Sequence, residues 1–506
     1  MFEIAIGSLF EVLAPINLLA SLGGVLFGLF VGSIPGLTIS LGMVLLLPFT
    51  YTMPPVTSIS LLLGLFISGM TGGSISAILL NIPGTPSASA TAIDGHKLAK
   101  EGKAADALGT AVTSSFFGGI VSLLALVLVA PIIARAALSF GSAELASLVF
   151  LGLTLICSFG QDSIVKGLIA GIVGLIFTTV GLDPIMARPR FTFGTVALQS
   201  GIGFLPVMIG LFAIPQILQG IVMKSDVIPK FEGNVSGVFT RIKDVFKFTK
   251  VKIISSLIGT GVGAIPGAGG PIAVFLAYDV QNKMRGRGKG AEDDAERNSL
   301  EGVAAPEAAN NAMCGGAMIP MLTLGIPGDP VTAILLGALM IQGLTPGPLL
   351  FQSNPRFVYA VFWAFLVAVI MVLFVTLSTM KVWIRVLRVP RWILLPTISV
   401  FCVVGTYSLQ NSFWDTGIML FFGLLGFLMR RYGFPLVPLL LALVLGGAFE
   451  RHVRTALVTS QGSPLIFITQ PISAVFVAIA LISFFTPIIR QFIRTIRTSK
   501  EGCEDD

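Results

Sequence analysis

The chain has 506 residues, of which 54% are hydrophobic and 11% are charged, and its mean hydropathy is +0.93. A soluble protein carries roughly 25% charged residues, so this composition excludes a soluble globular enzyme and indicates that most of the surface faces lipid. The net charge of +7 does not indicate nucleic-acid binding, because the basic residues stand in short clusters between apolar stretches, as in membrane proteins.

Apolar stretches that can form membrane-spanning helices recur along the chain. A bilayer core about 30 Å thick needs about 20 apolar residues per helical crossing, so we predict an all-α integral membrane protein with about twelve transmembrane helices. In chain order, the predicted spans run from Ile16 to Val31, Val56 to Leu80, Leu108 to Ala134, Leu145 to Phe159, Ile164 to Val180, Gly201 to Val222, Ile253 to Ala277, Val331 to Ile341, Phe357 to Met380, Ile393 to Leu409, Gly417 to Met429, Pro435 to Phe449, and Ala474 to Ile489.

Two further segments do not read as plain crossings. The stretch from Thr38 to Tyr51 is too short, and the stretch from Ala308 to Pro330 is interrupted by glycines and prolines. Such segments predict re-entrant or broken helices in addition to the spans.

Basic clusters indicate which loops face the cytoplasm. Clusters at Lys97 to Lys103, Lys224 to Lys252, Lys283 to Lys289 and Lys381 to Arg391 mark candidate cytoplasmic loops. Together with Arg490, Arg494 and Arg497 they predict a cytoplasmic carboxyl terminus. Arg451 and Arg454 do not fit this orientation, because they precede the last predicted span and would lie on the opposite side.

Two glycine–proline motifs occur twice, in the same order. The sequence GSIPG at 32–36 returns as GAIPG at 263–267, and NIPGTP at 81–86 returns as GIPGDP at 325–330. A single proline–glycine pair usually only kinks or ends a helix. Matched copies in two halves instead favour a transporter site at the interface of two repeats, which we place at residues 1–245 and 246–506, the second with extra carboxyl-terminal helices.

The motifs indicate an anion site without charged side chains. Broken helices expose free N–H groups and a partial positive charge at their amino ends, and glycine lets a carboxylate approach the backbone. The predicted substrate-binding residues are Pro35, Gly36, Ser74, Asn81, Pro83, Gly84, Thr85, Ser87, Pro266, Gly267, Asn310, Asn311, Pro327 and Gly328.

Oxygen-bearing side chains in the second half form a candidate site for a coupling ion. Asn311, Thr323, Asp329 and Glu307 offer the hard oxygen ligands that a sodium ion requires, and either acid can carry a proton instead. The alternative is that these polar residues only form hydrogen bonds between helices. We predict no other metal, no cofactor and no enzymatic activity, since HExxH, GK[ST] and GxSxG motifs are absent from the sequence.

Four long segments, at 32–51, 72–95, 306–330 and 431–446, resemble the large membrane subunit of the tripartite tricarboxylate transporters. The resemblance extends over nearly the whole chain, up to about Arg451. It implies a fold with two inverted structural repeats and an elevator-type movement.

The resemblance also implies a function. The expected protein is a secondary transporter of the bacterial inner membrane that imports tricarboxylates or related carboxylates, driven by a sodium or proton gradient. Its expected partners are a smaller TctB-like membrane subunit and a TctC-like periplasmic binding protein. The alternative function is a passive anion channel, whose flux would depend on neither a binding protein nor a coupling ion.

Overall fold

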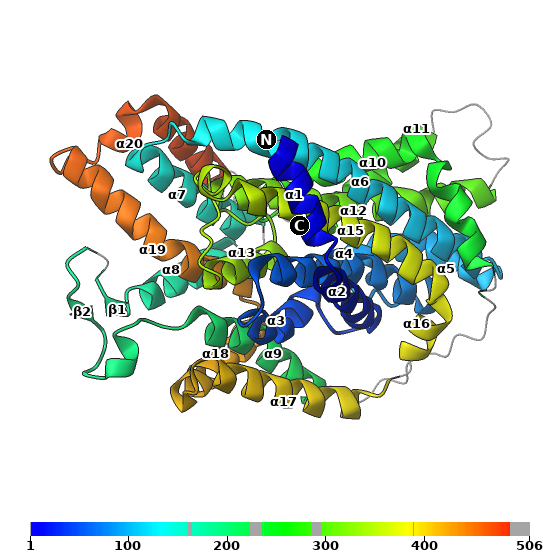
Figure 1. Cartoon of the computed structure of the whole chain (residues 1–506), viewed down its shortest axis with the longest axis horizontal. Coiled ribbons are helices and arrows are strands. Elements are labelled where there is room, and N and C mark those ends of the chain that lie inside the picture. Colours follow the sequence, from blue (N-terminus) through cyan, green and yellow to red (C-terminus); the bar gives the residue numbers. More distant parts are fainter. Residues whose placement is uncertain are drawn as a thin grey trace, which may run out of the picture. The chain divides into compact units, whose positions relative to one another are not determined.

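The computed structural model describes residues 2–159, 164–183, 185–222, 235, 237–285, 295–387 and 389–485. These residues form the twenty labelled α-helices α1–α20, a further helix at Pro471–Phe485, three short 3-10 helices and one pair of two-residue strands (Figure 1). The predicted all-α class is therefore confirmed. Lys224 and the cluster from Arg490 to Arg497 lie outside the described residues.

The chain divides into two compact units. Unit 1 comprises the described residues of Met1–Ala137 and Met208–Phe427, and unit 2 those of Leu138–Val207 and Leu428–Asp506. This division follows contacts in space, whereas the predicted repeats at 1–245 and 246–506 follow the order of the motifs and stay a prediction.

Unit 1 contains most of the helices, including all those that flank the repeated motifs. Its elements are α1 (Phe2–Val12), α2 (Pro15–Ser33), α3 (Ile39–Thr50), α4 (Pro55–Leu80), η1 (Pro86–Ala88), α5 (Ser89–Lys100), α6 (Ala104–Ala137), most of α9 (Phe204–Val222), η3 (Val238–Phe246), α10 (Thr249–Gly263), α11 (Gly269–Arg285), α12 (Ala295–Leu324), α13 (Pro330–Ile341), α14 (Leu350–Ser353), α15 (Pro355–Ser378), α16 (Met380–Val386), α17 (Arg391–Gln410) and most of α18 (Phe413–Arg431).

Unit 2 is smaller and carries none of the four motifs. Its elements are α7 (Ser142–Phe159), α8 (Ile164–Thr178), β1 (Gly181–Leu182), β2 (Pro189–Arg190), η2 (Val196–Leu198), α19 (Leu436–Thr459), α20 (Ile466–Thr469) and an apolar helix at Pro471–Phe485. The two strands pair antiparallel, with Gly181 opposite Arg190.

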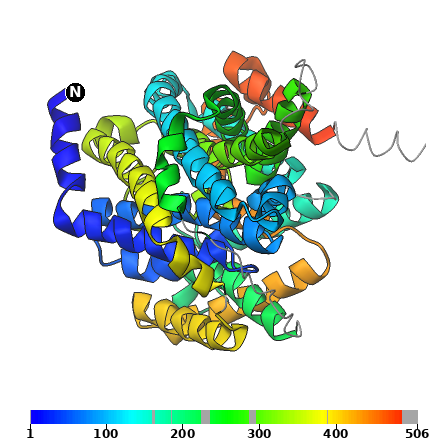
Figure 2. The ribbon, with the colours of Figure 1, turned by 90° about the vertical axis from the view of Figure 1, so that its right-hand side faces the viewer.

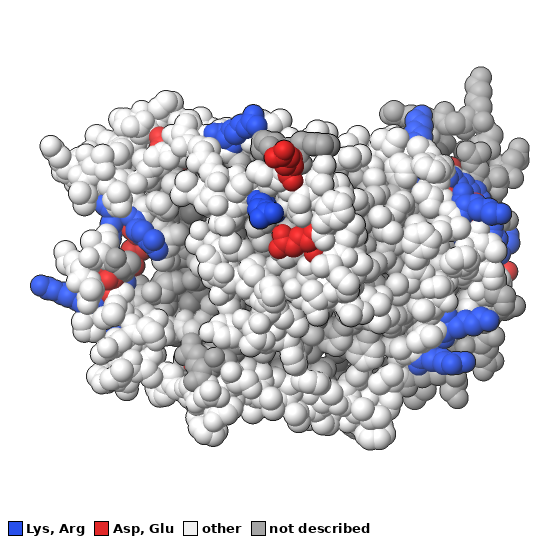
Figure 3. Space-filling model, in the orientation of Figure 1, with Lys and Arg blue, Asp and Glu red and all other residues white. Residues whose placement is uncertain are grey.

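Seven helices among the described residues are long and apolar enough to cross a membrane: α2, α4, α6, α9, α15, α18 and α19. Shorter apolar helices include α3, α7, α8, α13 and α17. The predicted total of about twelve crossings therefore depends on whether these shorter helices also cross. The visible face of the molecule agrees with a lipid environment, since it is largely free of charged side chains (Figure 3).

Glycines allow the helices of unit 1 to pack at short distance. Gly24, Gly28 and Gly32 follow one another at intervals of four along α2, and a Cβ atom on any of them would collide with a backbone carbonyl of α4. Gly259 and Gly263 of α10 meet the backbone of α12 in the same way. Small residues four apart are typical of closely packed membrane helices, and Figures 1 and 2 show α2 along α4.

The structure corrects two predicted elements. The span expected from Ile253 to Ala277 is wrong, because the chain turns between α10 and α11, where Gly267 and Gly269 have positive φ angles of 82° and 68°. The segment from Ala308 to Pro330 breaks only after α12 has ended at Leu324, since the helix continues through its internal prolines. Buried neighbours can satisfy the backbone groups that a proline frees.

Candidate functional site

The first motif of each half forms a turn between two helices. Pro35–Gly36 lies between α2 and α3, and Pro266–Gly267 lies between α10 and α11. Gly36 and Gly267 both adopt left-handed backbone angles, with φ of 93° and 82°. Only glycine takes this conformation without steric cost, so the residue type is explained by the turn.

The second motif of each half begins with a left-handed helix cap. Asn81 ends α4 with a φ of 57°, and Gly325 follows α12 with a φ of 70°. Asparagine tolerates this conformation better than most residues. The backbone role accounts for the presence of Asn81, and its exposed side chain lies at the surface of the turn.

The two motifs of each half touch one another. A Cβ atom added to Gly84 would collide with the carbonyl oxygen of Gly32, and one added to Gly328 would collide with that of Gly263. In the second half a hydrogen bond also joins the motifs, as the Gly267 N–H donates to the Gly328 carbonyl over 2.9 Å. The repeated glycines thus hold two turns against each other by direct backbone contact.

Residues from both halves meet between α4 and α12. The Thr71 hydroxyl donates to Asn311 Oδ1 over 3.3 Å, and Asn310 Nδ2 donates to the Met70 carbonyl over 3.2 Å. Ser87 Oγ lies 3.6 Å from Met70 Sδ. We call these five residues the central cluster.

The central cluster is buried and carries no charge. Two of its polar atoms, Asn310 Oδ1 and Asn311 Nδ2, are buried without a hydrogen-bond partner in the described part of the chain. An unsatisfied buried polar atom costs about 1–3 kcal/mol, so a ligand that satisfies it gains affinity. The free amide N–H of Asn311 suits a carboxylate oxygen, and the free carbonyl of Asn310 suits a cation.

Neighbouring residues complete the surroundings of the central cluster. The Thr85 and Ser87 hydroxyls lie 3.3 Å apart, and a Cβ atom on Gly270, at the start of α11, would meet Ser87 Cβ at 2.8 Å. The predicted residues Thr85, Ser87, Asn310 and Asn311 are therefore brought into one region by elements of both halves.

Glu307 forms a second buried polar group on α12. It is fully buried and accepts hydrogen bonds from Thr91 Oγ1 at 2.6 Å and from Ser115 Oγ at 3.0 Å. Both donors are neutral, and no ion pair to Glu307 occurs within the described ranges. A bare carboxylate is costly inside a membrane protein, so a proton or a cation should accompany it.

The other predicted ion ligands have local partners. Asp329 caps α13, because its Oδ1 accepts from the backbone N–H of Thr332 at 2.8 Å and from its hydroxyl at 2.6 Å. The Thr323 hydroxyl donates to the Ile319 carbonyl over 2.7 Å. These contacts stabilise the ends of α12 and α13.

The remaining predicted substrate ligands are divided between buried and more open positions. The Ser74 hydroxyl donates to the Thr71 carbonyl over 2.7 Å, within its own helix. Pro327 and Gly328 are buried, whereas Pro83 is half-buried and Asn81 is exposed.

Sequence reasoning missed Met70, Thr71, Thr91 and Ser115. Thr71 lies 240 residues from Asn311, and Thr91 lies 216 residues from Glu307. No spacing in the sequence relates residues so far apart. Thr71 and Ser115 stand out only as small hydroxyls within apolar helices, and Met70 takes part through its backbone carbonyl, which no residue type reveals.

The comparisons with known proteins identify the family. The model of the family described as "Tripartite tricarboxylate transporter TctA family" matches residues 18–441. The chain belongs to this family. The predicted resemblance is confirmed, and membership of the TctA family, together with the seven apolar helices, indicates a multi-pass membrane transporter subunit rather than an enzyme.

Two relatives from Agrobacterium vitis extend the comparison. The chain is 36% identical over 469 residues to the "Uncharacterized 52.8 kDa protein in TAR-I ttuC' 3'region", covering 93% of this chain and 92% of the relative. It is 34% identical over 252 residues to the "Uncharacterized protein in TAR-II ttuC' 3'region", covering 49% of this chain and 100% of that relative. No solved structure matches the chain.

Proposed function

We propose that this member of the TctA family is the large membrane subunit of a secondary transporter that imports tricarboxylates or related carboxylates. The observation that carries the proposal is the central cluster, where elements of both halves bury an unpaired amide donor and an unpaired carbonyl acceptor. Such a site can replace part of the hydration of an anion and of a cation without a fixed charge.

Glu307 is the proposed carrier of the coupling charge. Its carboxylate is buried against two neutral hydroxyls, so its charge must be balanced by a proton or by a sodium ion held with the Thr91 and Ser115 oxygens. Binding one cation here and the anion at the central cluster would couple carboxylate uptake to the cation gradient.

The proposed architecture is a pair of inverted repeats, at 1–245 and 246–506, that works as an elevator. The equivalent glycine contacts of Gly84 with Gly32 and of Gly328 with Gly263 support the repeats. All four motifs fall within unit 1, which makes this unit the candidate for the moving part. The elevator step itself rests on the family resemblance.

The proposed partners are a smaller TctB-like membrane subunit and a TctC-like periplasmic binding protein that delivers the carboxylate. The proposed location is the inner membrane of a bacterium. Both proposals rest on membership of a tripartite transporter family.

Uptake into proteoliposomes tests the proposed function. The complete system, with both partners, should accumulate labelled citrate or another di- or tricarboxylate only under an imposed sodium or proton gradient, and only with the binding protein. An Asn311→Ala variant in the same system tests whether accumulation depends on the central cluster. Equilibration without a gradient or a binding protein would instead establish a passive anion channel.

A further inference from the structure

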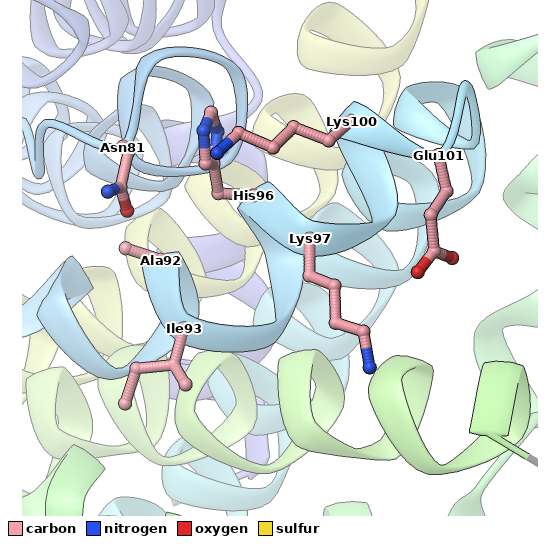
Figure 4. A pocket seen from close by; sticks show the side chains of 7 residues that line it. All are labelled: Asn81, Ala92, Ile93, His96, Lys97, Lys100 and Glu101. Carbon is pink, nitrogen blue, oxygen red and sulfur yellow. The ribbon is translucent and has the colours of Figure 1, made fainter.

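An open pocket of about 340 Å³ lies between the end of α4 and the outer side of α5. The lining residues are Asn81, Ala92, Ile93, His96, Lys97, Lys100 and Glu101 (Figure 4). The pocket thus carries two lysines against one glutamate. It also includes Asn81, the first residue of the repeated turn.

The basic side of the pocket is preformed. His96 Nδ1 lies 3.0 Å from the Ile78 carbonyl. A carbonyl only accepts hydrogen bonds, so Nδ1 carries the proton, the contact fixes the ring, and Nε2 of the neutral ring is a hydrogen-bond acceptor. Figure 4 shows the Lys100 side chain extending toward the His96 ring, with Asn81 beyond it and Lys97 and Glu101 directed elsewhere.

The lysines are available to a ligand. Both are exposed, and neither forms an ion pair in the part of the chain that the structure describes. Lysines in the last turn of a helix also interact favourably with the partial negative charge at the helix carboxyl end. That explains why they occur at the end of α5, but not why the side chains of Asn81 and His96 lie beside Lys100.

The pocket is close in the chain to both buried polar groups. Thr91, which binds Glu307, precedes the pocket residue Ala92. Ser87 of the central cluster and Asn81 of the pocket flank the same turn. In this turn Asn81 and Ile82 are exposed, whereas Thr85 and Ser87 are buried.

We propose that this pocket binds a free di- or tricarboxylate anion on its passage between the central cluster and the cytoplasm. That the anion passes through the pocket during transport rests on the proposed function. That the pocket faces the cytoplasm rests on the basic cluster at Lys97 to Lys103. Lys100 supplies a charged donor, Asn81 Nδ2 can donate to a second carboxylate, and Lys97, which lines the same pocket, adds positive charge at its rim. The phosphate headgroup of an anionic lipid shares this chemistry.

Protection of the lysine amines tests the pocket directly. The full chain is placed in nanodiscs of phosphatidylcholine, which has no net charge, and treated with an acylating reagent at constant ionic strength. Citrate should slow acylation of Lys100 by about two- to fivefold, and that of Lys97, whose side chain is directed away from Lys100, to a smaller extent. The exposed Lys250 is the control, and its rate should not change. The neutral trimethyl ester of citrate should protect neither pocket lysine.

Two results would overturn the proposal. Equal acylation of Lys97, Lys100 and Lys250 with and without citrate would show that the pocket does not bind the anion. Protection by phosphatidylglycerol in the nanodisc, without further protection by citrate, would show that a lipid headgroup occupies it.

The test is independent of transport. Protection in an Asn311→Ala variant that has lost uptake would show that the pocket binds without the central cluster. Protection in a wild-type protein that transports no carboxylate would refute the proposed function but retain the anion pocket. Uptake without protection would refute the pocket alone.

Discussion

Glu307 and Asp329 are both buried acids with neutral hydrogen-bond donors, but only the donors of Glu307 come from other helices. Asp329 uses its carboxylate to cap α13, so its position is explained by local structure. Glu307 has no such helix role. Its partners, Thr91 and Ser115, come from α5 and α6, and a change in its charge is therefore felt by three helices.

A Glu307→Gln variant should lose gradient-driven accumulation but retain carboxylate exchange. Glutamine keeps the shape of glutamate and can still bond to both hydroxyls, yet it cannot be protonated or neutralise a cation. Accumulation and counterflow in the same proteoliposomes measure the two activities. Glu144→Gln, an acid in the first turn of α7, is the control and should change neither. Retained accumulation in Glu307→Gln would remove Glu307 from coupling.

The repeated glycines give a second prediction at the scale of single residues. Gly84→Ala or Gly328→Ala should each destabilise the protein by about 1–3 kcal/mol, the usual cost of overpacking, because the new methyl group meets a backbone carbonyl. Gly261→Ala is the matched control, since a Cβ atom there has no neighbour within 4 Å. Thermal unfolding in detergent measures the difference. Equal stability of all three variants would contradict the close contact.

The proposed site depends on the contact between helices α4 and α12, which we call the seam. Helix α4 is buried along its length, as expected for a helix that is apolar on all sides. Its bonds to α12 through Met70 and Thr71 join the two halves. The seam can therefore have two roles, holding the helices together and binding a ligand.

Two substitutions separate these roles. Asn311→Ala should reduce carboxylate uptake about tenfold, because it removes a buried donor as well as the bond between the helices. Thr71→Val removes only the bond and should reduce uptake about threefold at most. Initial uptake rates, corrected for the amount of inserted protein, measure both. Equal losses in the two variants would mean that Asn311 acts only through the seam.

The sequence predicts elements better than it predicts contacts. Proline and glycine mark the turn at Pro35–Gly36, which needs a residue with positive φ. At Pro266–Gly267 the surrounding apolar stretch outweighed the same signal, so a continuous span was predicted where the chain turns. The continuous course of α12 was not predicted, since whether a helix continues past a proline such as Pro306 or Pro320 depends on its neighbours. The contact of Asn311 with Thr71 depends on how two distant helices pack, which local patterns do not encode.

At the scale of the whole molecule, unit 2 explains Arg454, one of the two arginines that disagreed with the predicted orientation. Arg454 Nη1 lies 2.8 Å from Asp183 Oδ2, and Arg454 Nη2 lies 2.7 Å from Glu450 Oε1. Arg190 Nη1 lies 2.6 Å from the same Glu450 oxygen. Backbone N–H groups of Met186 and Ile185, together with Arg454, hold the pKa of Asp183 well below its usual range. Ion pairs therefore explain the position of Arg454. The orientation rule describes only an excess of lysine and arginine in cytoplasmic loops, and it allows single arginines on the other side.

The orientation of the chain can be tested at two positions separated by one predicted span. Helix α9 lies between Ser200 and Lys250 in the sequence, so the two residues should face opposite sides of the membrane. The basic residues from Lys243 to Lys252 predict a cytoplasmic position for Lys250. Ser200 and the neighbouring strands are then expected on the opposite side, which is the periplasm in the proposed location.

Single cysteines at these two positions, in a chain whose four native cysteines have been replaced, provide the measurement. Both side chains are exposed, so accessibility should depend on the membrane rather than on burial. In intact spheroplasts an impermeant maleimide should label Ser200→Cys and leave Lys250→Cys unlabelled until the membrane is opened. The reverse pattern would invert the chain. Four helices, α6 to α9, separate the loop around Lys97 and Lys100 from Lys250, so the pocket would move with Lys250 to the side at which the proposed binding protein would deliver its carboxylate.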